Sequence, residues 1–152
     1  MSDIIAISRR LDEIESLLER LRKSDAGGVS VAYTPTYTGT TVAGVTTYTT
    51  QEGWYTVTDR MIFVNGLVVW TAASGTGSGL ISLPTILDTN RARASGVVRT
   101  SAVTFANGSI QVFVSATVTG FTMESPITNG ASTNVAVEAA GNVTFSIWYP
   151  IA

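Results

Sequence analysis

The chain of 152 residues contains neither cysteine nor histidine. Without thiols it cannot form disulfides, and without imidazoles it cannot build the usual zinc sites or a catalytic triad that needs histidine as its base. No apolar run reaches the ~18 residues that indicate a transmembrane helix. These absences predict a protein that is not an enzyme, holds no metal or cofactor and does not enter a membrane.

Charge is scarce beyond the first 25 residues. The chain has 9 Lys and Arg and 11 Asp and Glu, and eleven of these side chains precede residue 26. A net charge of −2 gives no long-range attraction to nucleic acid or to anionic membranes, so neither is expected as a partner. A domain with so few charges relies on hydroxyl and amide groups for solubility, or it buries much of its surface against copies of itself. The mean hydropathy of +0.29 favours the second explanation, in which the domain buries surface against copies of itself.

A heptad repeat marks the helix that is expected over residues 3–24. Its a and d positions are Ile4, Ile7, Leu11, Ile14, Leu18 and Leu21. Isoleucine at both positions of the first heptad, and leucine followed by isoleucine in the second, favour three or four strands over two. Parallel helices in register would also pair Arg10 with Glu15 of a neighbour. We therefore predict a parallel trimeric coiled coil in a first domain, residues 1–26; the alternative is an amphipathic helix that packs on its own domain or on another protein.

From residue 27 onward, short runs rich in Val, Ile, Thr, Tyr and Phe replace the helical periodicity and predict an all-β domain over residues 27–152. The expected strands are 29–34, 42–50, 54–58, 61–73, 80–83, 97–106, 109–119, 134–140 and 143–149. Strands joined by short turns without helices predict a jelly-roll-like antiparallel β-sandwich, with an immunoglobulin-like topology as the alternative.

Turn residues predict how these strands connect. Asn107-Gly108 and Gly141-Asn142 each predict a two-residue hairpin, the second between residues 135–137 and 143–145. Asn65-Gly66 also resembles a hairpin turn. Alternatively, the turn lies at Asp59-Arg60 and Gly66 is a bulge inside one long strand.

One block of the β domain resembles a module at the C-termini of bacteriophage tail-fibre, tail-tip and head-surface proteins. The block reads GWYTVTDRMIFVNGLVVWT over residues 53–71, continues with SGTG at 74–77 and ISLP at 81–84, and Tyr33-Thr34-Pro35-Thr36 matches the start of the module. The resemblance places the turn at Asp59-Arg60. It implies trimeric β-sandwich heads mounted on a coiled coil, and so short a chain suits a spike, a head fibre or a capsid decoration protein.

These features together predict a structural virion protein, assembled in the host cytoplasm, that forms a homotrimeric fibre, spike or decoration on a phage capsid or tail. The N-terminal helix would attach it to other virion proteins. The alternative is a lectin-like module that binds a host-surface glycan. The loop expected over residues 122–134, with Met123, Glu124 and Asn129, is the predicted receptor-facing surface because loop tips tolerate variation.

The remaining motifs predict no catalysis. The glycine-rich segment 75–79 lacks the Lys-Ser/Thr ending of a phosphate-binding loop, so a flexible connection is expected. Glycoside hydrolysis needs two carboxylates beside one bond, and only the fold could bring Glu52 or Asp59 near Glu124. Three arginines are interpreted as solvated side chains or inter-subunit ion pairs, with a small basic patch as the alternative: Arg91, Arg93 and Arg99.

Overall fold

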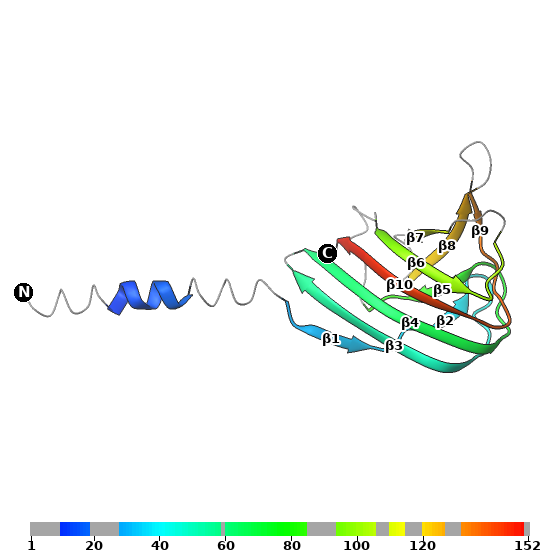
Figure 1. Cartoon of the computed structure of the whole chain (residues 1–152), viewed down its shortest axis with the longest axis horizontal. Coiled ribbons are helices and arrows are strands. Elements are labelled where there is room, and N and C mark those ends of the chain that lie inside the picture. The colour runs from blue at the N-terminus through cyan, green and yellow to red at the C-terminus, as the bar shows by residue number, and fades with distance from the viewer. Residues whose placement is uncertain are drawn as a thin grey trace, which may run out of the picture.

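In the computed structural model of the chain, two antiparallel β-sheets pack face to face behind a short helix (Figure 1). The structure describes residues 10–18, 28–58, 60–84, 94–105, 110–114, 120–126 and 132–150. The described helix covers residues 10–18. Within the described ranges, no helix is long and apolar enough to span a membrane. The protein is mainly β, as its composition predicts.

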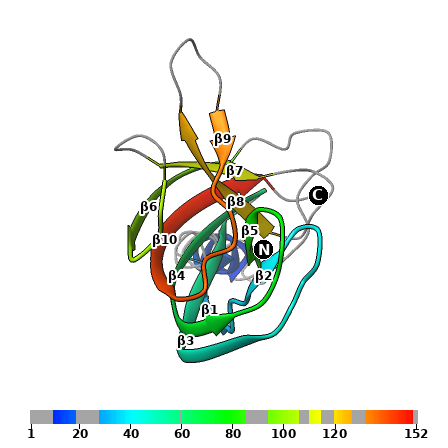
Figure 2. The same ribbon diagram turned by 90° about the vertical axis from the view of Figure 1, so that its right-hand side faces the viewer.

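The strands are divided between two sheets, which we call sheet A and sheet B. Sheet A has the order β1 (Ser30–Tyr33), β3 (Thr46–Thr58), β4 (Met61–Ala73), β10 (Gly141–Pro150) and β6 (Ser95–Ser101). Sheet B has the order β2 (Tyr37–Gly39), β5 (Gly79–Ser82), β8 (Gly120–Pro126) and β7 (Gln111–Val114), and β9 (Ser132–Asn134) pairs with β8. Figure 2 looks along the long axis and shows the two layers, with the β8–β9 pair projecting from them.

The hydrophobic core lies between the sheets because β4 and β10 present alternate side chains to sheet B. The buried side chains of sheet A are Ile62, Val64, Val68, Trp70, Val143, Phe145, Ile147 and Tyr149. Sheet B contributes Ile81, Phe121 and Met123. The rings of Phe121 and Phe145 meet edge to face with centroids 5.1 Å apart, a geometry that aromatic pairs prefer. The two sheets are thus joined by one continuous apolar layer.

The long strand predicted after Asp59-Arg60 is confirmed, because β4 continues without a break from Met61 to Ala73. The predicted bulge at Gly66 is wrong. Gly66 pairs in regular register with Gly53 on one side and Phe145 on the other, and the irregularity of the β3–β4 ladder lies between Thr47 and Thr50 instead. Gly66 lacks a side chain for a packing reason, since a Cβ there would overlap the ring of Phe145.

The predicted two-residue hairpin at Gly141-Asn142 is wrong. Residues 135–137 do not fold back on the last strand: the Val135 N–H donates to the Met123 carbonyl (2.8 Å), and the Val135 carbonyl accepts from the Gly79 N–H (2.9 Å), so this segment joins sheet B. β10 pairs with β4 and β6 in sheet A. The strands on either side of Asn107-Gly108 belong to different sheets, β6 to sheet A and β7 to sheet B. Residues 106–109 themselves lie outside the described ranges.

The glycine-rich segment 75–79 is held by backbone hydrogen bonds rather than free, so the expected flexible connection is wrong. The Thr76 N–H donates to the Val42 carbonyl (2.9 Å), and the Thr76 carbonyl accepts from the Thr41 N–H (3.0 Å). The Gly77 carbonyl accepts from the Val137 N–H (3.0 Å). Glycine in this segment lets its backbone lie close to the backbones of neighbouring segments, which a side chain would prevent.

Tyr33 carries a buried hydroxyl that has no hydrogen-bond partner among the described residues. Burial, and to a smaller extent the nearby Tyr149, raise the pKa of the Tyr33 hydroxyl above its ordinary value of 10.0. We expect Tyr33→Phe to raise the free energy of unfolding by about 1 kcal/mol at neutral pH, because it removes an unsatisfied buried polar group. Chemical denaturation followed by circular dichroism measures this change. A loss of stability would contradict it.

The raised pKa of Tyr33 also predicts a pH dependence. Below pH 10 the hydroxyl is protonated in both the folded and the unfolded chain, so it adds no pH dependence. As the pH rises above 10, the unfolded chain ionises first and the folded state loses stability. The difference in stability between Tyr33→Phe and wild type should therefore grow above pH 10. The matched control is Tyr55→Phe, since the Tyr55 ring contacts that of Tyr33 (centroids 6.2 Å apart) but its hydroxyl is not among the buried unpaired groups.

Candidate functional site

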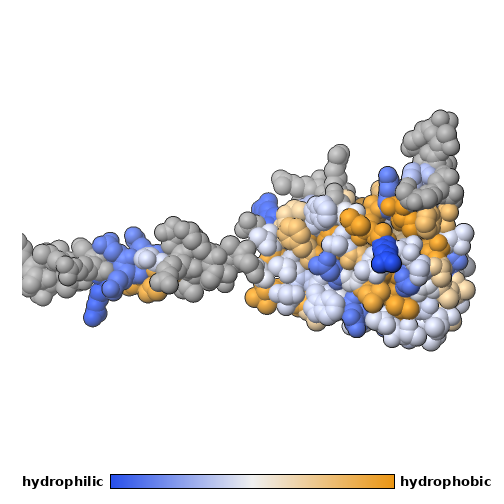
Figure 3. Space-filling model, in the orientation of Figure 1, coloured by the Kyte–Doolittle hydropathy of each residue, from blue (hydrophilic) through white to orange (hydrophobic). Residues whose placement is uncertain are grey.

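The outer face of sheet A, which points away from sheet B, exposes large apolar side chains. Trp54 is 47% exposed, Phe63 46%, Val97 69% and Trp148 39%. Figure 3 views this face and shows apolar patches across it. An antiparallel sheet that faces water on one side ordinarily alternates apolar and polar side chains. The outer face, defined here by these four residues together with Leu67, Glu52 and Arg99, is therefore the surface of the described domain that most resembles a binding site.

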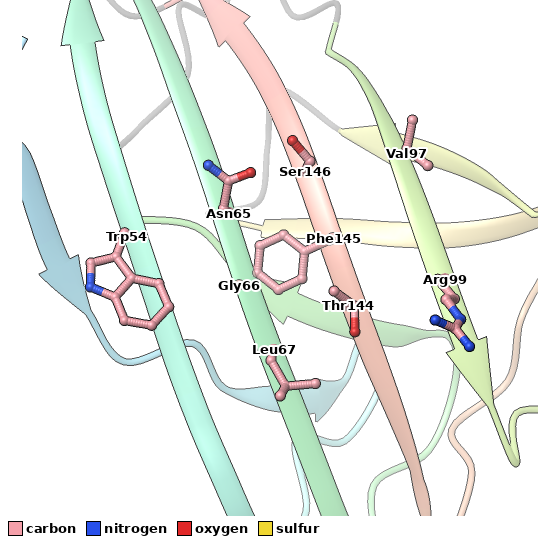
Figure 4. A pocket seen from close by; sticks show the side chains of 9 residues that line it. All are labelled: Trp54, Asn65, Gly66, Leu67, Val97, Arg99, Thr144, Phe145 and Ser146. Carbon is pink, nitrogen blue, oxygen red and sulfur yellow. The ribbon is translucent and has the colours of Figure 1, made fainter.

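A groove of about 370 Å³ crosses this outer face. It is lined by Trp54, Asn65, Gly66, Leu67, Val97, Arg99, Thr144, Phe145 and Ser146 (Figure 4). β10 lies between β4 and β6 and carries only the small side chains of Thr144 and Ser146 at this point, whereas Trp54, Leu67 and Arg99 extend from other strands. The groove therefore results from small residues on a central strand beside larger residues around it.

Opposite charges stand at the two ends of one row across this face. Glu52 pairs with Leu67, Leu67 with Thr144, and Thr144 with Arg99, so the four residues follow one another across β3, β4, β10 and β6. Neighbouring strands are about 4.8 Å apart, which separates the backbones of Glu52 and Arg99 by roughly 14 Å. The two charges therefore do not neutralise each other within one chain and remain available to a partner.

A polar network joins β2, β4 and the segment before β10 through Tyr37, Trp70 and Glu138. The Tyr37 ring stacks on Trp70 with centroids 4.1 Å apart, and the Tyr37 hydroxyl accepts the Glu138 N–H (3.0 Å). The Trp70 Nε1–H donates to the Glu138 carbonyl (2.9 Å). Burial is the main cause of the raised pKa of Tyr37. Because every polar group named here is paired, this network is structural and offers no group for chemistry.

The predicted receptor-facing surface is only partly compatible with the structure. Met123 is fully buried on β8, so its assignment to an exposed loop is wrong. Its neighbours belong to a strand, because β8 pairs with both β7 and β9. Glu124 accepts a hydrogen bond from the Ser132 hydroxyl (2.5 Å), which joins β8 to β9. Asn129 lies outside the described residues.

Half of the predicted coiled-coil positions can be located. Leu11, Ile14 and Leu18 lie on the described helix, as do Arg10 and Glu15, and all five are exposed. Leu17 widens the same apolar stripe. The remaining predicted contact residues lie outside the described ranges: Ile4, Ile7 and Leu21.

The carboxylates that the sequence singles out do not come together. Glu52 is on β3 in sheet A and Glu124 on β8 in sheet B, each in a position that alternates with core residues, so they lie on opposite outer faces of the sandwich. Among the described residues, no group of three carboxylates is placed to hold a metal ion. Asp59, Arg91 and Arg93 lie outside the described ranges.

Sequence reasoning missed the outer face of sheet A, although β4 carried a signal for it. Its residues are apolar on both faces: Ile62 and Val64 point to the core while Phe63 points outward. A strand that is apolar on both faces indicates a sheet covered on both sides.

Comparisons of the chain with protein-family models, curated proteins and solved structures find no match.

Proposed function

We propose that this chain is a structural protein that assembles as a homotrimer through a parallel coiled coil and forms a fibre, spike or decoration on a phage capsid or tail. The observation that carries the proposal is the exposed stripe on the described helix. Leu11 is 54% exposed, Ile14 53% and Leu18 56%. Burying one such side chain contributes about 1.5–3 kcal/mol, and within the described part of its own chain the stripe remains exposed. Partner helices would bury it.

Three copies fit this stripe better than two. Leu at a and Ile at d, as at Leu11 and Ile14, favour bundles of more than two helices. Leu17 at a g position adds apolar surface outside the a/d seam, which a third helix would cover. In a parallel bundle Arg10 of one copy meets Glu15 of the next.

The assignment to a virion rests on the resemblance of residues 33–84 to the phage module, with a helix ahead of a β-sandwich as that module implies. We interpret the two sheets as a jelly-roll-like head and the helix as the segment that attaches to other virion proteins. Detection of the chain in purified virions by mass spectrometry, and its location by immunogold labelling, test the assignment. Virions that lack the chain would contradict it.

The homotrimer is tested by one charged substitution inside the stripe. We expect wild type to have three times the 16.0 kDa mass of one chain in light scattering. Ile14→Asp should dissociate the trimer at concentrations where wild type remains assembled, because it places a carboxylate in the apolar seam. The matched control is Ser16→Asp, which adds the same charge at an f position, opposite the seam, and should leave the mass unchanged. A monomeric wild type would contradict the proposal.

A carbohydrate-binding module is the second candidate, and the groove is the observation that favours it. Exposed Trp54 on β3 neighbours Asn65 on β4, and Arg99 lines the same groove from β6. An aromatic ring with a few polar groups in a concave surface suits a small polar ligand that also has an apolar face, as a sugar has. A glycan array with wild type and Trp54→Ala tests this candidate. Binding that is lost in the variant would favour it, whereas the absence of binding would favour the structural role alone.

A further inference from the structure

We propose that the outer face of sheet A is the contact between neighbouring heads of the trimer, with Glu52 of one copy paired to Arg99 of the next. The inference rests on the proposed homotrimer and names the surface that its heads use. Each head would present the β3 end of the face to one neighbour and the β6 end to the other. Such a head-to-tail contact closes into a ring when three copies are related by a threefold axis.

The composition of the face fits a protein interface better than a solvated surface. The cores of interfaces are enriched in aromatic residues, Met and Arg and depleted of Lys, Glu and Asp. The outer face holds Trp54, Phe63 and Trp148, and its charged residues are Glu52 and Arg99. Leu67 and Val97 complete an apolar surface between the two charges. In a ring of three heads, the two neighbouring copies would cover it from its two ends.

The positions of Glu52 and Arg99 make neighbouring heads complementary in charge. Glu52 and Arg99 end the same cross-strand row, and no ion pair joins them within the described chain. In a head-to-tail arrangement every negative end faces a positive end, so no charge is left unpaired and no like charges meet. Complementary charges of this kind fix the orientation of an interface, because like charges in contact cost several kcal/mol.

The path of the chain enters every head at the same edge, so parallel helices would give the heads the same orientation about the threefold axis. The described chain enters the sandwich at Gly28, where a Cβ would be 2.5 Å from the Thr56 methyl group of β3. It continues into β1, the edge strand that pairs with β3. Helices that associate in parallel therefore lead three chains into sheet A at the same edge, on the side of the face that carries Glu52.

Chemical cross-linking tests the contact directly, because the natural chain has no cysteine. The variant is Glu52→Cys with Arg99→Cys, treated at low protein concentration with a bismaleimide shorter than the separation of the two sites within one chain. We expect covalent dimers and trimers on a denaturing gel. Each single variant should remain monomeric on the gel. The matched control is Glu52→Cys with Glu124→Cys, whose second site lies in sheet B and should give no trimer.

The outcomes separate this inference from the homotrimer on which it rests. A trimeric mass in light scattering without cross-linked species would overturn the contact and leave the homotrimer standing. A monomeric mass would overturn both. Quenching of tryptophan fluorescence by an oligosaccharide that Trp54→Ala abolishes, in a protein that does not cross-link, would also overturn the contact and identify the face as a sugar site.

Charge reversal gives a second readout that needs no cysteine. Glu52→Arg and Arg99→Glu each place like charges in contact, and we expect each to raise the concentration at which half the trimer has dissociated by about tenfold or more. The double variant restores opposite charges and should return that concentration to near the wild-type value. Both substituted residues lie on the outer face of sheet A, so each single variant should fold normally and its circular dichroism spectrum should be unchanged. Failure of the double variant to restore assembly would count against the contact.

Discussion

Replacing Trp70 with alanine is expected to lower the free energy of unfolding by about 3–5 kcal/mol, the usual cost of removing a large aromatic side chain from a core. Trp70 is 2% exposed and stacks on the Tyr37 ring with centroids 4.1 Å apart. Its Nε1–H donates to the Glu138 carbonyl (2.9 Å). The substitution therefore leaves a cavity and an unpaired carbonyl, and it frees the ring that holds β2 against sheet A. A small domain has about 5–15 kcal/mol of stability in total, so this loss is severe.

Urea denaturation followed by circular dichroism measures the effect of Trp70→Ala. Trp70→Phe separates its causes: phenylalanine keeps an aromatic ring beside Tyr37 but loses the hydrogen bond, so we expect a smaller loss of about 1–3 kcal/mol. Val29→Ala is the surface control, because Val29 is 82% exposed and its truncation should cost little. A Trp70→Ala protein as stable as the Val29→Ala protein would contradict the packing described here.

The long strand rich in β-formers was predictable from sequence, whereas a short strand that depends on distant neighbours was not. β4 occupies residues Met61–Ala73 as predicted, because β-branched and aromatic residues fill it on both sides of Asn65-Gly66. β2 has only three residues, Tyr37–Gly39, and forms because Tyr37 pairs with Ile81 and packs on Trp70. No local pattern of three residues specifies such tertiary contacts.

The wrong hairpin at Gly141-Asn142 has a physical cause. Asn-Gly and Gly-Asn sequences permit a tight turn, but the strands on either side pair according to which sheet can bury their apolar side chains. Val135 is buried against sheet B and Val143 in sheet A, so the chain crosses from one sheet to the other between them. Local turn preference does not reveal that crossing.

The candidate site was less predictable than the fold. Met123 was assigned to a loop expected over residues 122–134, yet it lies on β8 in the core. All three tryptophans lie in strand-like sequence, and only the structure separates exposed Trp54 and Trp148 from buried Trp70. The row from Glu52 to Arg99 joins residues 47 positions apart through strand register, which composition and periodicity do not encode.

Gly44→Ala is expected to cost about 2–5 kcal/mol in the free energy of unfolding. Gly44 has a φ of +70°, a conformation that costs an L-residue with a side chain about 1–2 kcal/mol. A Cβ at this position would also be 2.5 Å from the Gly75 Cα and would overlap the Gly75 nitrogen, and forced overlap adds about 1–3 kcal/mol. These neighbours are backbone atoms that cannot rotate away. The segments 42–45 and 74–76 are also held together by hydrogen bonds, including Ser74 N–H to the Val45 carbonyl (3.1 Å).

Two further variants identify which of these costs dominates. Ala43→Gly makes the reverse exchange at the adjacent exposed residue and should cost at most about 1 kcal/mol, through added freedom of the unfolded chain. Gly44→Asn tolerates the positive φ better than alanine but retains a Cβ. If overlap with Gly75 dominates, Gly44→Asn should be about as unstable as Gly44→Ala, whereas recovery in the asparagine variant would attribute the loss to φ. Equal stability of Gly44→Ala and Ala43→Gly in thermal denaturation would contradict the close crossing of the two segments.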